Sequence, residues 1–411
     1  MAEKRKPDIR FKGFTDDWEQ RKLGEILQER NIRTSDFENN PLYSLTIESG
    51  VTPKTDRYER SSLVTKTEDL FKVVKPNEFV TNPMNLRFGA LGYNTNTFSV
   101  SVSGYYDVFS IDDDKCSGFW NSYFKTPIAM KIFDNVATGS LIEKRRVKYS
   151  TLQQLDFYMP RELSEKIKIG TYMDALDNLI TLHQRKYDKL INVKKFMLQK
   201  MFPQSGSNVP EIRFAGFTDV WEQRKFGDIT EIKSALRVHK EEWTNTGVPF
   251  YRSSDVMSAI NGTTNTKAFI SEELYEKLSS TSGKLEKGDV LVTGGGSVGN
   301  PYIVPNNEPL YTKDADLLWI KNNEKFDSYF VYEFFFSPVF RTYLESISHV
   351  GTIAHYTITQ LADTPIALPS IEEQKQIGVC FKNLDNLITL HHSKLEKLKN
   401  IKKSMLEKMF I

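Results

Sequence analysis

Cysteine is nearly missing from this sequence: Cys116 and Cys380 are the only two in 411 residues, and they stand in unrelated contexts. Two isolated cysteines give no disulfide framework and none of the paired spacing of a zinc site. Long apolar runs are also missing, since no stretch approaches the roughly eighteen residues of a membrane-spanning helix. The first residues lack the apolar core of a signal peptide. We therefore expect a reduced, cytoplasmic protein without a membrane segment.

An excess of one charge is missing too. The 55 Lys and Arg residues are balanced by 53 Asp and Glu residues, which leaves a formal net charge of +2. Such a balance neither requires nor excludes nucleic acid, because a basic face can be offset by an acidic one elsewhere. The length of 411 residues is too great for one ordinary core and indicates two or three domains.

What the sequence does contain is a repeat. IRFKGFTDDWEQRK (9–22) returns as IRFAGFTDVWEQRK (212–225), and LDNLITLHQRKYDKLINVKKFMLQKMF (176–202) matches LDNLITLHHSKLEKLKNIKKSMLEKMF (384–410) without a gap. Each half of the chain opens with the first segment and closes with the second. The residues between them share only local similarities. The pattern predicts a tandem duplication with a constant frame around two different fillings.

The closing segments predict long helices, because their apolar residues recur in steps of three and four. A narrow apolar stripe between charged flanks is typical of a coiled coil, although the stripe slips near Val193 and Ile401. Two matching rods of roughly 60 Å favour antiparallel pairing with each other, while two ordinary core helices are the alternative. Matching histidines on the stripe fit a role in helix register better than metal binding. The expected pairing residues are Leu176, Ile180, His183, Leu190, Leu384, Ile388, His391 and Leu398.

The predicted fold class is α+β, a pseudo-twofold tandem repeat of two mixed α/β domains separated by two long helices that pair as an antiparallel coiled coil. The domains are expected at 1–158 and 205–367, and the long helices at 159–204 and 368–411. Runs such as DVLVTG, PYIVP and DLLWIK predict strands, whereas SEELYEKLSS and SYFVYEFFFSPVFRTYLESI predict helices.

The WEQRK segments are expected to begin short helices, with Thr-Asp caps and a Glu three positions later. Their proposed role is structural, since two copies would dock the two fillings onto the rods at equivalent points. Each closing segment is preceded by a short strand-like run that ends in Pro, LDFYMP in the first half and TPIALP in the second.

The two frames together resemble the specificity subunit of type I restriction-modification systems, and the resemblance spans essentially the whole chain. LPSIEEQKQI (368–377) follows the family pattern closely, whereas MPRELSEKIKI (159–169) differs by one residue of spacing and lacks the Glu-Gln pair. The resemblance implies that each filling is a target recognition domain for one half of a bipartite, asymmetric site in double-stranded DNA. It also implies that the paired helices set the gap between half-sites and seat two modification subunits.

The same resemblance implies that this chain is not an enzyme and holds no cofactor or metal of its own. The modification partners would bind S-adenosylmethionine and methylate adenine, and restriction subunits would cleave DNA with ATP and Mg. Two alternatives stay open from the residues alone. One is a self-contained adenine methyltransferase, which would need its own S-adenosylmethionine pocket. The other is a coiled-coil assembly protein without a nucleic-acid role.

Candidate DNA-binding residues are polar and basic side chains in loop-like stretches of the fillings. Their types suit phosphate contacts or base edges, although any one of them could equally be a turn residue. The set comprises Asn82, Asn85, Arg87, Tyr93, Asn94, Arg145, Arg146, Lys148, Arg252, Ser253, Ser254, Ser297, Asn300, His349, Thr352 and His355.

Two further features stay open between DNA contact and a plain structural role. TGGGSVGN (293–300) has the formal spacing of a dinucleotide-binding loop, but a strand-like run follows where that motif needs a helix. The stretch is therefore expected to be a tight turn or a loop that approaches phosphate. The helix ends carry Lys194, Lys195 and Lys200 in one copy and Lys402, Lys403 and Lys408 in the other, which would face DNA or water.

Overall fold

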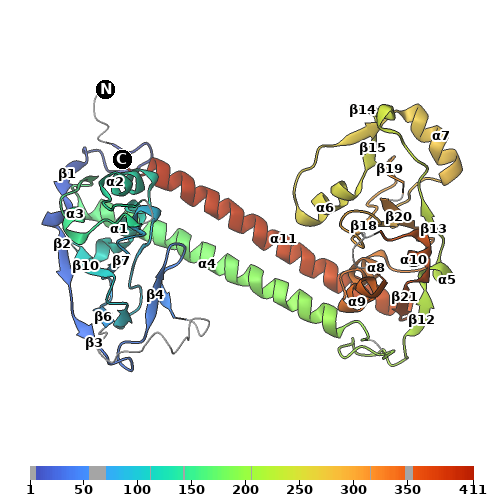
Figure 1. Cartoon of the computed structure of the whole chain (residues 1–411), viewed down its shortest axis with the longest axis horizontal. Helices are drawn as coiled ribbons and strands as arrows, with labels where there is room; N and C mark the ends of the chain where they lie inside the picture. The colour runs from blue at the N-terminus through green and yellow to red at the C-terminus, as the bar shows by residue number, and fades with distance from the viewer. Residues whose placement is uncertain are drawn as a thin grey trace. The chain divides into compact units, whose positions relative to one another are not determined.

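The computed structural model describes residues 6–54, 71–111, 113–141, 144–204, 206–314, 316–347 and 355–411. The chain divides into two compact units (Figure 1). Unit 1 comprises Met1–Gln184 with His392–Ile411, and unit 2 comprises Arg185–His391. Each of the two long helices, α4 (Leu163–Lys200) and α11 (Ile371–Lys408), therefore contributes one part to each unit. Both helices were predicted from the sequence, and both lie inside the predicted ranges.

The described part of unit 1 contains four small sheets, one of which pairs the two strands that flank the rest of the unit. The largest has the strand order β2 (Leu27–Arg30), β10 (Asp107–Ile111), β7 (Phe79–Thr81), β8 (Leu91–Tyr93). A second sheet joins β3 (Arg33–Thr34), β6 (Phe71–Val74) and β9 (Val100–Val102), and β4 (Tyr43–Thr46) forms a hairpin with β5 (Gly50–Pro53). The helices are α1 (Ser117–Tyr123), α2 (Pro127–Val136) and α3 (Tyr149–Leu152).

Unit 2 repeats the main sheet with the order β13 (Ile232–Ser234), β20 (Leu317–Ile320), β17 (Val290–Thr293), β18 (Pro301–Ile303). A second sheet has the order β14 (Trp243–Thr244), β16 (Ala268–Ile270), β15 (Val248–Tyr251), β19 (Tyr311–Thr312). The helices are α5 (Phe226–Ile229), α6 (Ser253–Asn261), α7 (Glu272–Ser282), α8 (Ser328–Phe334), α9 (Pro338–Ile347) and α10 (Ile358–Asp363). The strands predicted in DVLVTG, PYIVP and DLLWIK are confirmed.

The WEQRK segments are strands, so the predicted short helices are wrong. β1 (Glu19–Lys22) pairs antiparallel with β11 (Asp156–Met159), and β12 (Glu222–Lys225) pairs with β21 (Pro365–Leu368). The partners are the strand-like runs before the long helices. In the WEQRK segments, pairing with a distant strand thus outweighs the local capping pattern and determines the conformation. We call the residues enclosed by these strand pairs module 1 (23–155) and module 2 (226–364), and the repeated strands and long helices the frame.

The residues that precede the repeated strands contact the long helices in an equivalent way in both units. Arg10 clamps Glu165 of α4 with two hydrogen bonds of 2.6 and 2.7 Å, and Arg213 clamps Glu373 of α11 at 2.7 and 2.8 Å. Both carboxylates are buried. Glu165 therefore keeps the place of Glu373 in spite of the altered spacing before it. The first copy lacks only the glutamine, Gln374, whose side-chain amide holds the Pro369 carbonyl at 3.0 Å.

Aromatic side chains complete the two cores in parallel. In unit 1, the Phe410 ring lies 6.4 Å from Trp18 and 5.0 Å from Tyr123. In unit 2, the Phe202 ring lies 6.3 Å from Trp221 and 6.3 Å from Phe334. Both tryptophans of the WEQRK segments are at most 2% exposed, which is consistent with the docking role proposed for these segments.

The long helices pair in opposite directions within each unit. In unit 1, Met173 and Leu176, from the first half of α4, share a core with Met405 and Met409 from the end of α11. In unit 2, Met201, from the end of α4, shares a core with Ile377 from the start of α11. Of the predicted pairing residues, Leu176 and Leu384 are buried. The other six, Ile180, His183, Leu190, Ile388, His391 and Leu398, are half-buried.

The predicted slip of the apolar stripe has a structural cause. Val193 is 36% exposed, and the following Lys194 turns inward instead, where its ammonium lies 2.6 Å from Asp385 and 3.0 Å from Glu333. The equivalent Lys402 contacts Asp177 of α4. These two lysines were expected from the sequence to face DNA or water, but both form ion pairs with acidic side chains instead. Lys200 pairs with Glu211, and the neighbouring Lys195, Lys403 and Lys408 are exposed.

In the part of the chain that the structure describes, no helix has the length and apolarity to cross a bilayer.

Candidate nucleic-acid interface

The two units carry equivalent loops at the end of equivalent sheets. Residues 82–90 connect β7 to β8 in unit 1, and residues 294–300 connect β17 to β18 in unit 2. Gly89 and Gly299 end the loops with positive φ angles of 87° and 74°, a backbone region in which a side chain is strained. β18, rather than a helix, follows the glycine-rich stretch 293–300. This stretch is therefore a turn between strands, and the dinucleotide-binding motif is excluded there.

In unit 1 the loop lies beside the basic stretch of residues 144–148. The Val147 amide donates to the Pro83 carbonyl at 2.9 Å, and Arg146 bridges to Thr138. Val147 is buried, whereas Arg146 and Lys148 are exposed. Two candidate stretches that lie about sixty residues apart in the sequence therefore form one surface.

Two arginines of this surface are held by α2. Arg87 Nη1 lies 3.0 Å from Asp134 Oδ1, and Arg145 Nη1 lies 3.7 Å from the same oxygen. Arg145 also donates to the carbonyls of Ala137 at 3.1 Å and Asp134 at 2.7 Å. Their guanidinium groups are fixed rather than mobile, so their charge is presented in a defined place.

The surface also carries an aromatic residue that was not among the candidates. Phe88 is 52% exposed, and the Arg87 guanidinium stacks 4.3 Å from its ring centre. Asn85, at the same loop, is exposed. Asn82 is half-buried, and its side-chain oxygen accepts from the Met84 amide at 3.1 Å. Aromatic rings beside cations are common where proteins stack on bases. The sequence around Phe88 has no periodic pattern that would have marked this residue as exposed.

Two candidates of unit 1 are structural residues instead. Asn94 is 1% exposed, and its amide donates to the carbonyls of Val74 and Phe98, both at 2.9 Å. Tyr93 points to α4 and donates to Asp174 at 3.0 Å, and burial raises the pKa of its hydroxyl. Their residue types made both positions candidates for DNA binding, but their polar side-chain groups form hydrogen bonds within unit 1.

Unit 2 builds its surface in the same way. The Tyr356 amide donates to the Gly294 carbonyl at 2.8 Å, which is the counterpart of the Val147 contact in unit 1. The preceding His355 and the loop residue Ser297 are exposed. The Asn300 side chain accepts from Arg341 of α9 at 3.2 Å and donates to the Ser297 carbonyl at 2.8 Å. The candidates His349 and Thr352 lie outside the described residues.

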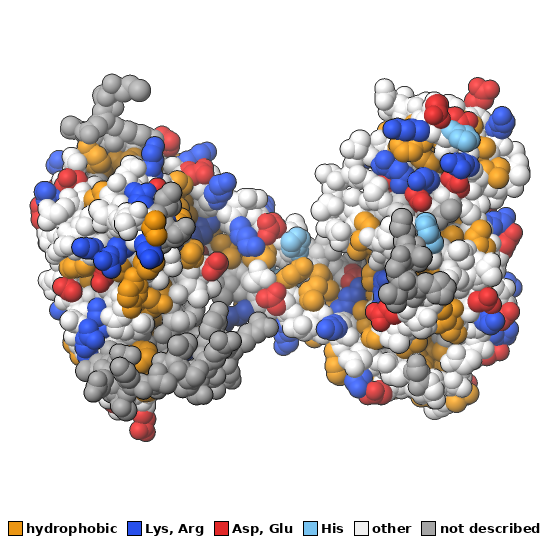
Figure 2. All heavy atoms as spheres, in the orientation of Figure 1, with side chains coloured by type: hydrophobic (Ala, Val, Ile, Leu, Met, Phe, Trp, Pro, Cys, Tyr) orange, Lys and Arg blue, Asp and Glu red, His pale blue; other side chains and the backbone are white. Residues whose placement is uncertain are grey.

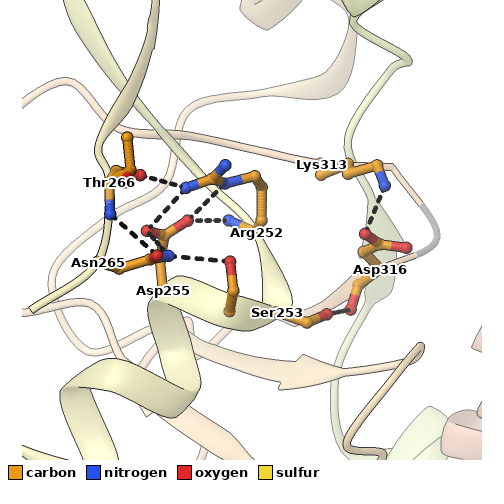
Figure 3. Close-up of polar contacts among 8 residues, drawn as sticks. Arg252, Ser253, Asp255, Asn265, Thr266, Lys313 and Asp316 are labelled. Atoms are coloured by element: carbon orange, nitrogen blue, oxygen red, sulfur yellow. Dashed lines mark hydrogen bonds and ion pairs between the residues drawn. The ribbon is translucent and has the colours of Figure 1, made fainter. Parts of the chain in front are cut away.

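The start of α6 adjoins this loop (Figure 3). The Asp316 carbonyl accepts from the Ser253 hydroxyl at 3.0 Å and from the Gly294 amide at 2.8 Å, so the two stretches share one acceptor. Lys313 pairs with the Asp316 carboxylate at 2.7 Å. The structure thus brings Ser253 close to the candidates of the glycine-rich loop.

Arg252 and Ser254 are engaged within module 2. The Arg252 guanidinium lies 2.9 Å from Asp255 and also donates to the Thr266 carbonyl, while Ser254 accepts from Asn265 at 2.9 Å. This network caps α6 and ties it to the strand connection after it. Arg252 therefore has a structural role, whether or not its remaining exposed edge meets a ligand.

Lysine and arginine side chains are visible on the drawn face of each unit, interspersed with apolar and acidic ones (Figure 2). This distribution accords with the near-neutral total charge. Within the described ranges, no three His, Cys, Asp or Glu side chains converge as metal ligands would. The two surfaces therefore offer basic, polar and aromatic groups suited to contacts with phosphates and bases.

Comparison with known proteins identifies relatives of the chain. Residues 218–400 match the family model of the type I restriction modification DNA specificity domain. The chain is 24% identical over 254 residues to the type I restriction enzyme MjaVIII specificity subunit of Methanocaldococcus jannaschii, and the match covers 59% of each protein. S.HindORF215P of Haemophilus influenzae is 25% identical over 254 residues, which cover 60% of this chain and 61% of the relative. The matches thus span about three fifths of the length of these curated relatives.

The solved structures include a similar fold over the full length. The crystal structure of the type I restriction-modification system S subunit from M. genitalium aligns with 99% of this chain and 99% of its own, with a TM-score of 0.59 and 14% identity. At this identity the likeness establishes the fold alone.

Proposed function

We propose that this chain, which belongs to the family of type I restriction-modification specificity subunits, reads DNA for its complex and performs no catalysis itself. Each module reads one half of a bipartite, asymmetric site in double-stranded DNA. The long helices set the spacing of the half-sites and dock two modification subunits, which methylate adenine with S-adenosylmethionine. Restriction subunits, which use ATP and Mg, join the complex for cleavage.

The observation that carries the proposal is the equivalence of the two loop surfaces on a repeated frame. The contacts Val147 to Pro83 and Tyr356 to Gly294 place the same part of each module beside the same strand connection. The side chains presented there differ, with Asn85, Arg87 and Phe88 in one unit and Ser297 and Asn300 in the other. Equivalent surfaces with different side chains suit two unlike half-sites, since base edges are read by side-chain type.

The modules are expected to act independently. Replacing residues 230–366 with the corresponding segment of another specificity subunit should change one half-site and leave the other intact. Mapping of methylated adenines in DNA from cells that also carry the modification subunit measures both half-sites at once. A change in both half-sites would contradict modular recognition.

Two further outcomes separate the alternatives. Binding of S-adenosylmethionine by the isolated chain would favour a self-contained methyltransferase. Binding of the assembled complex to DNA without salt dependence or sequence preference would favour an assembly role without nucleic acid, because phosphate contacts release counterions and make affinity fall with salt.

A further inference from the structure

The contact between each module and the long helices involves a pair of helices that the two halves share. Residues 117–136 and 328–347 have equal length and fold alike, with α1 followed by α2 in unit 1 and α8 followed by α9 in unit 2. Thr126 and Ser337 cap the second helix at the same place and accept from the amides of Ala129 and Phe340. Position 118 of module 1 therefore corresponds to position 329 of module 2.

The first helix of each pair packs on a glycine of a long helix. A Cβ atom at Gly170 of α4 would lie 2.6 Å from the Phe119 backbone nitrogen, and one at Gly378 of α11 would lie 3.1 Å from Tyr329 Cβ. Such close approach means that side chains around the glycine are pressed together across the contact. The charged positions near this glycine can therefore be compared between the two units.

In unit 1 the long helices present acidic side chains to module 1. Asp174 lies against Gly118, where a Cβ atom would be 2.8 Å from the Asp174 Cγ atom. Lys125 of module 1 is the basic group here, and its pKa is lowered to about 8 by burial and by Lys402, while Asp177 and Asp174 act in the opposite direction. The helices thus contribute two aspartates and one lysine, and the module contributes a lysine.

In unit 2 the sign is reversed at one position of the helices, whereas Lys194 and Asp385 repeat the Lys402 and Asp177 pair of unit 1. Lys382 of α11, at the position equivalent to Asp174, lies 4.5 Å from the Tyr329 ring centre. Lys194 lies 3.0 Å from the fully buried Glu333 of module 2, a position that is Ser122 in module 1. Lys194 also lies 5.6 Å from the ring centre of Phe336, the counterpart of Lys125.

A second carboxylate of module 2 follows the same rule. Burial raises the pKa of Asp327, and Lys375 and Lys382 of α11 act against that rise. The equivalents of Asp327 and Lys375 in unit 1 are Cys116 and Ile167, which carry no charge. The helices therefore present mainly basic groups to module 2, and module 2 contributes carboxylates and aromatic rings to the contact.

We propose that this contact is a charge-matched interface that determines which module each half of the frame accepts. The frame around Asp174 accepts a module with a glycine at position 118 and a lysine at position 125. The frame around Lys382 accepts a module with aromatic residues at positions 329 and 336 and a carboxylate at position 333. Exchange of the modules would press the Tyr329 ring into the space of Asp174 and bring Lys125 toward Lys382, where like charges repel.

The inference concerns assembly of the chain and does not depend on what the loop surfaces bind. Its first test is a double-mutant cycle in the full chain with Asp174→Lys, Lys125→Glu and the double variant, measured by thermal unfolding. Each single variant is expected to lower the unfolding midpoint, and the double variant is expected to recover the part of the loss that comes from charge, since Tyr93 lacks its Asp174 acceptor in both chains that carry Asp174→Lys. Glu407→Lys, at an exposed glutamate of α11 in the same unit, makes the same charge change and should leave the midpoint nearly unchanged.

The second test exchanges residues 23–155 and 226–364 between the two halves of the frame. The exchanged chain is expected to unfold at a lower temperature than the parent, and adding Asp174→Lys with Lys382→Asp should raise its midpoint. An exchanged chain as stable as the parent would overturn the proposal. If the exchanged chain fails to fold, the cycle decides the matter, because independent effects of Asp174→Lys and Lys125→Glu would equally overturn it.

Discussion

Removal of the Lys194 ammonium tests the contact between the frame and a buried carboxylate of module 2. In Lys194→Met the apolar stem of the side chain is kept, while Glu333 and Asp385 lose the cation that lies 3.0 and 2.6 Å from them. The Glu333 side chain is fully buried, and its Oε2 has no hydrogen-bond partner among the described atoms. Its charge would then have neither water nor a counterion to stabilise it.

The expected loss is about 3 kcal/mol of unfolding free energy near pH 9, at the lower end of the roughly 3–5 kcal/mol found when one partner of a buried ion pair is removed. The lower end applies because Asp385 is 36% exposed and retains some hydration. Lys402→Met is the matched control, since Lys402 contacts the 37% exposed Asp177 and no buried glutamate. Its loss should stay below about 1 kcal/mol.

The loss should also depend on pH. Burial raises the pKa of Glu333, and Lys194 opposes that rise, so the carboxyl of the variant holds its proton to a higher pH than in the parent. A group that binds its proton more tightly in the folded state makes stability fall as the pH rises from the ordinary glutamate pKa toward the raised value. Because the Glu333 pKa of the parent is itself raised to about 8, the variant should lose little at pH 5 and most near pH 9.

Urea unfolding of the three chains at pH 5 and pH 9 measures these differences, with Lys194→Met/Glu333→Gln as the rescue. The amide removes the unpaired charge, so the double variant should regain most of the stability at pH 9 and lose the pH dependence. Equal losses for Lys194→Met and Lys402→Met, or no gain from Glu333→Gln, would refute the assignment of Lys194 as the counterion of a buried carboxylate.

The remaining predictions concern close packing and DNA. Gly170→Ala should destabilise the chain by about 1–3 kcal/mol through overpacking against Phe119, and a gain of about 1 kcal/mol, as for an exposed helical glycine, would show that the contact is loose. Arg146→Gln should weaken DNA binding of the assembled complex for all sequences and lower the slope of log affinity against log salt by about 1; an unchanged slope would remove it from the phosphate contacts. Phe88→Ala should lower DNA affinity about tenfold, within the roughly 1–3 kcal/mol of base stacking, whereas Phe98→Ala, at an equally exposed ring, should not; equal effects would contradict a stacking role.

The repeated elements could be predicted from the sequence because their signals are local and occur twice. The helical period predicted α4 and α11, and the gapless match predicted that they form equivalent contacts. The strands β1 and β12 were mistaken for helices because a Thr-Asp cap is a local signal, whereas their partners lie more than a hundred residues away. The sequence of a short segment does not show which distant strand it pairs with.

The candidate site was predicted in part for a similar reason. The candidates Arg146 and Lys148 are exposed, but Asn94 is buried because its amide meets two carbonyls that the sequence does not place beside it. Phe88 was missed because exposure of a single aromatic residue in a loop depends on tertiary structure. The ion pairs of Lys194 and Lys402 were missed because their acidic partners lie on the opposite helix.

The placement of Phe410 in the core of unit 1 has a consequence for synthesis on the ribosome. Unit 2 is a continuous stretch, Arg185–His391, so all of its residues are available before translation reaches the final helix segment. Unit 1 begins before unit 2 in the chain but needs His392–Ile411, and its Trp18 and Tyr123 stay without the Phe410 ring until residue 410 is translated. The half of the protein that is made first is therefore finished last, and a nascent chain would expose its apolar core to chaperones or aggregation throughout that interval.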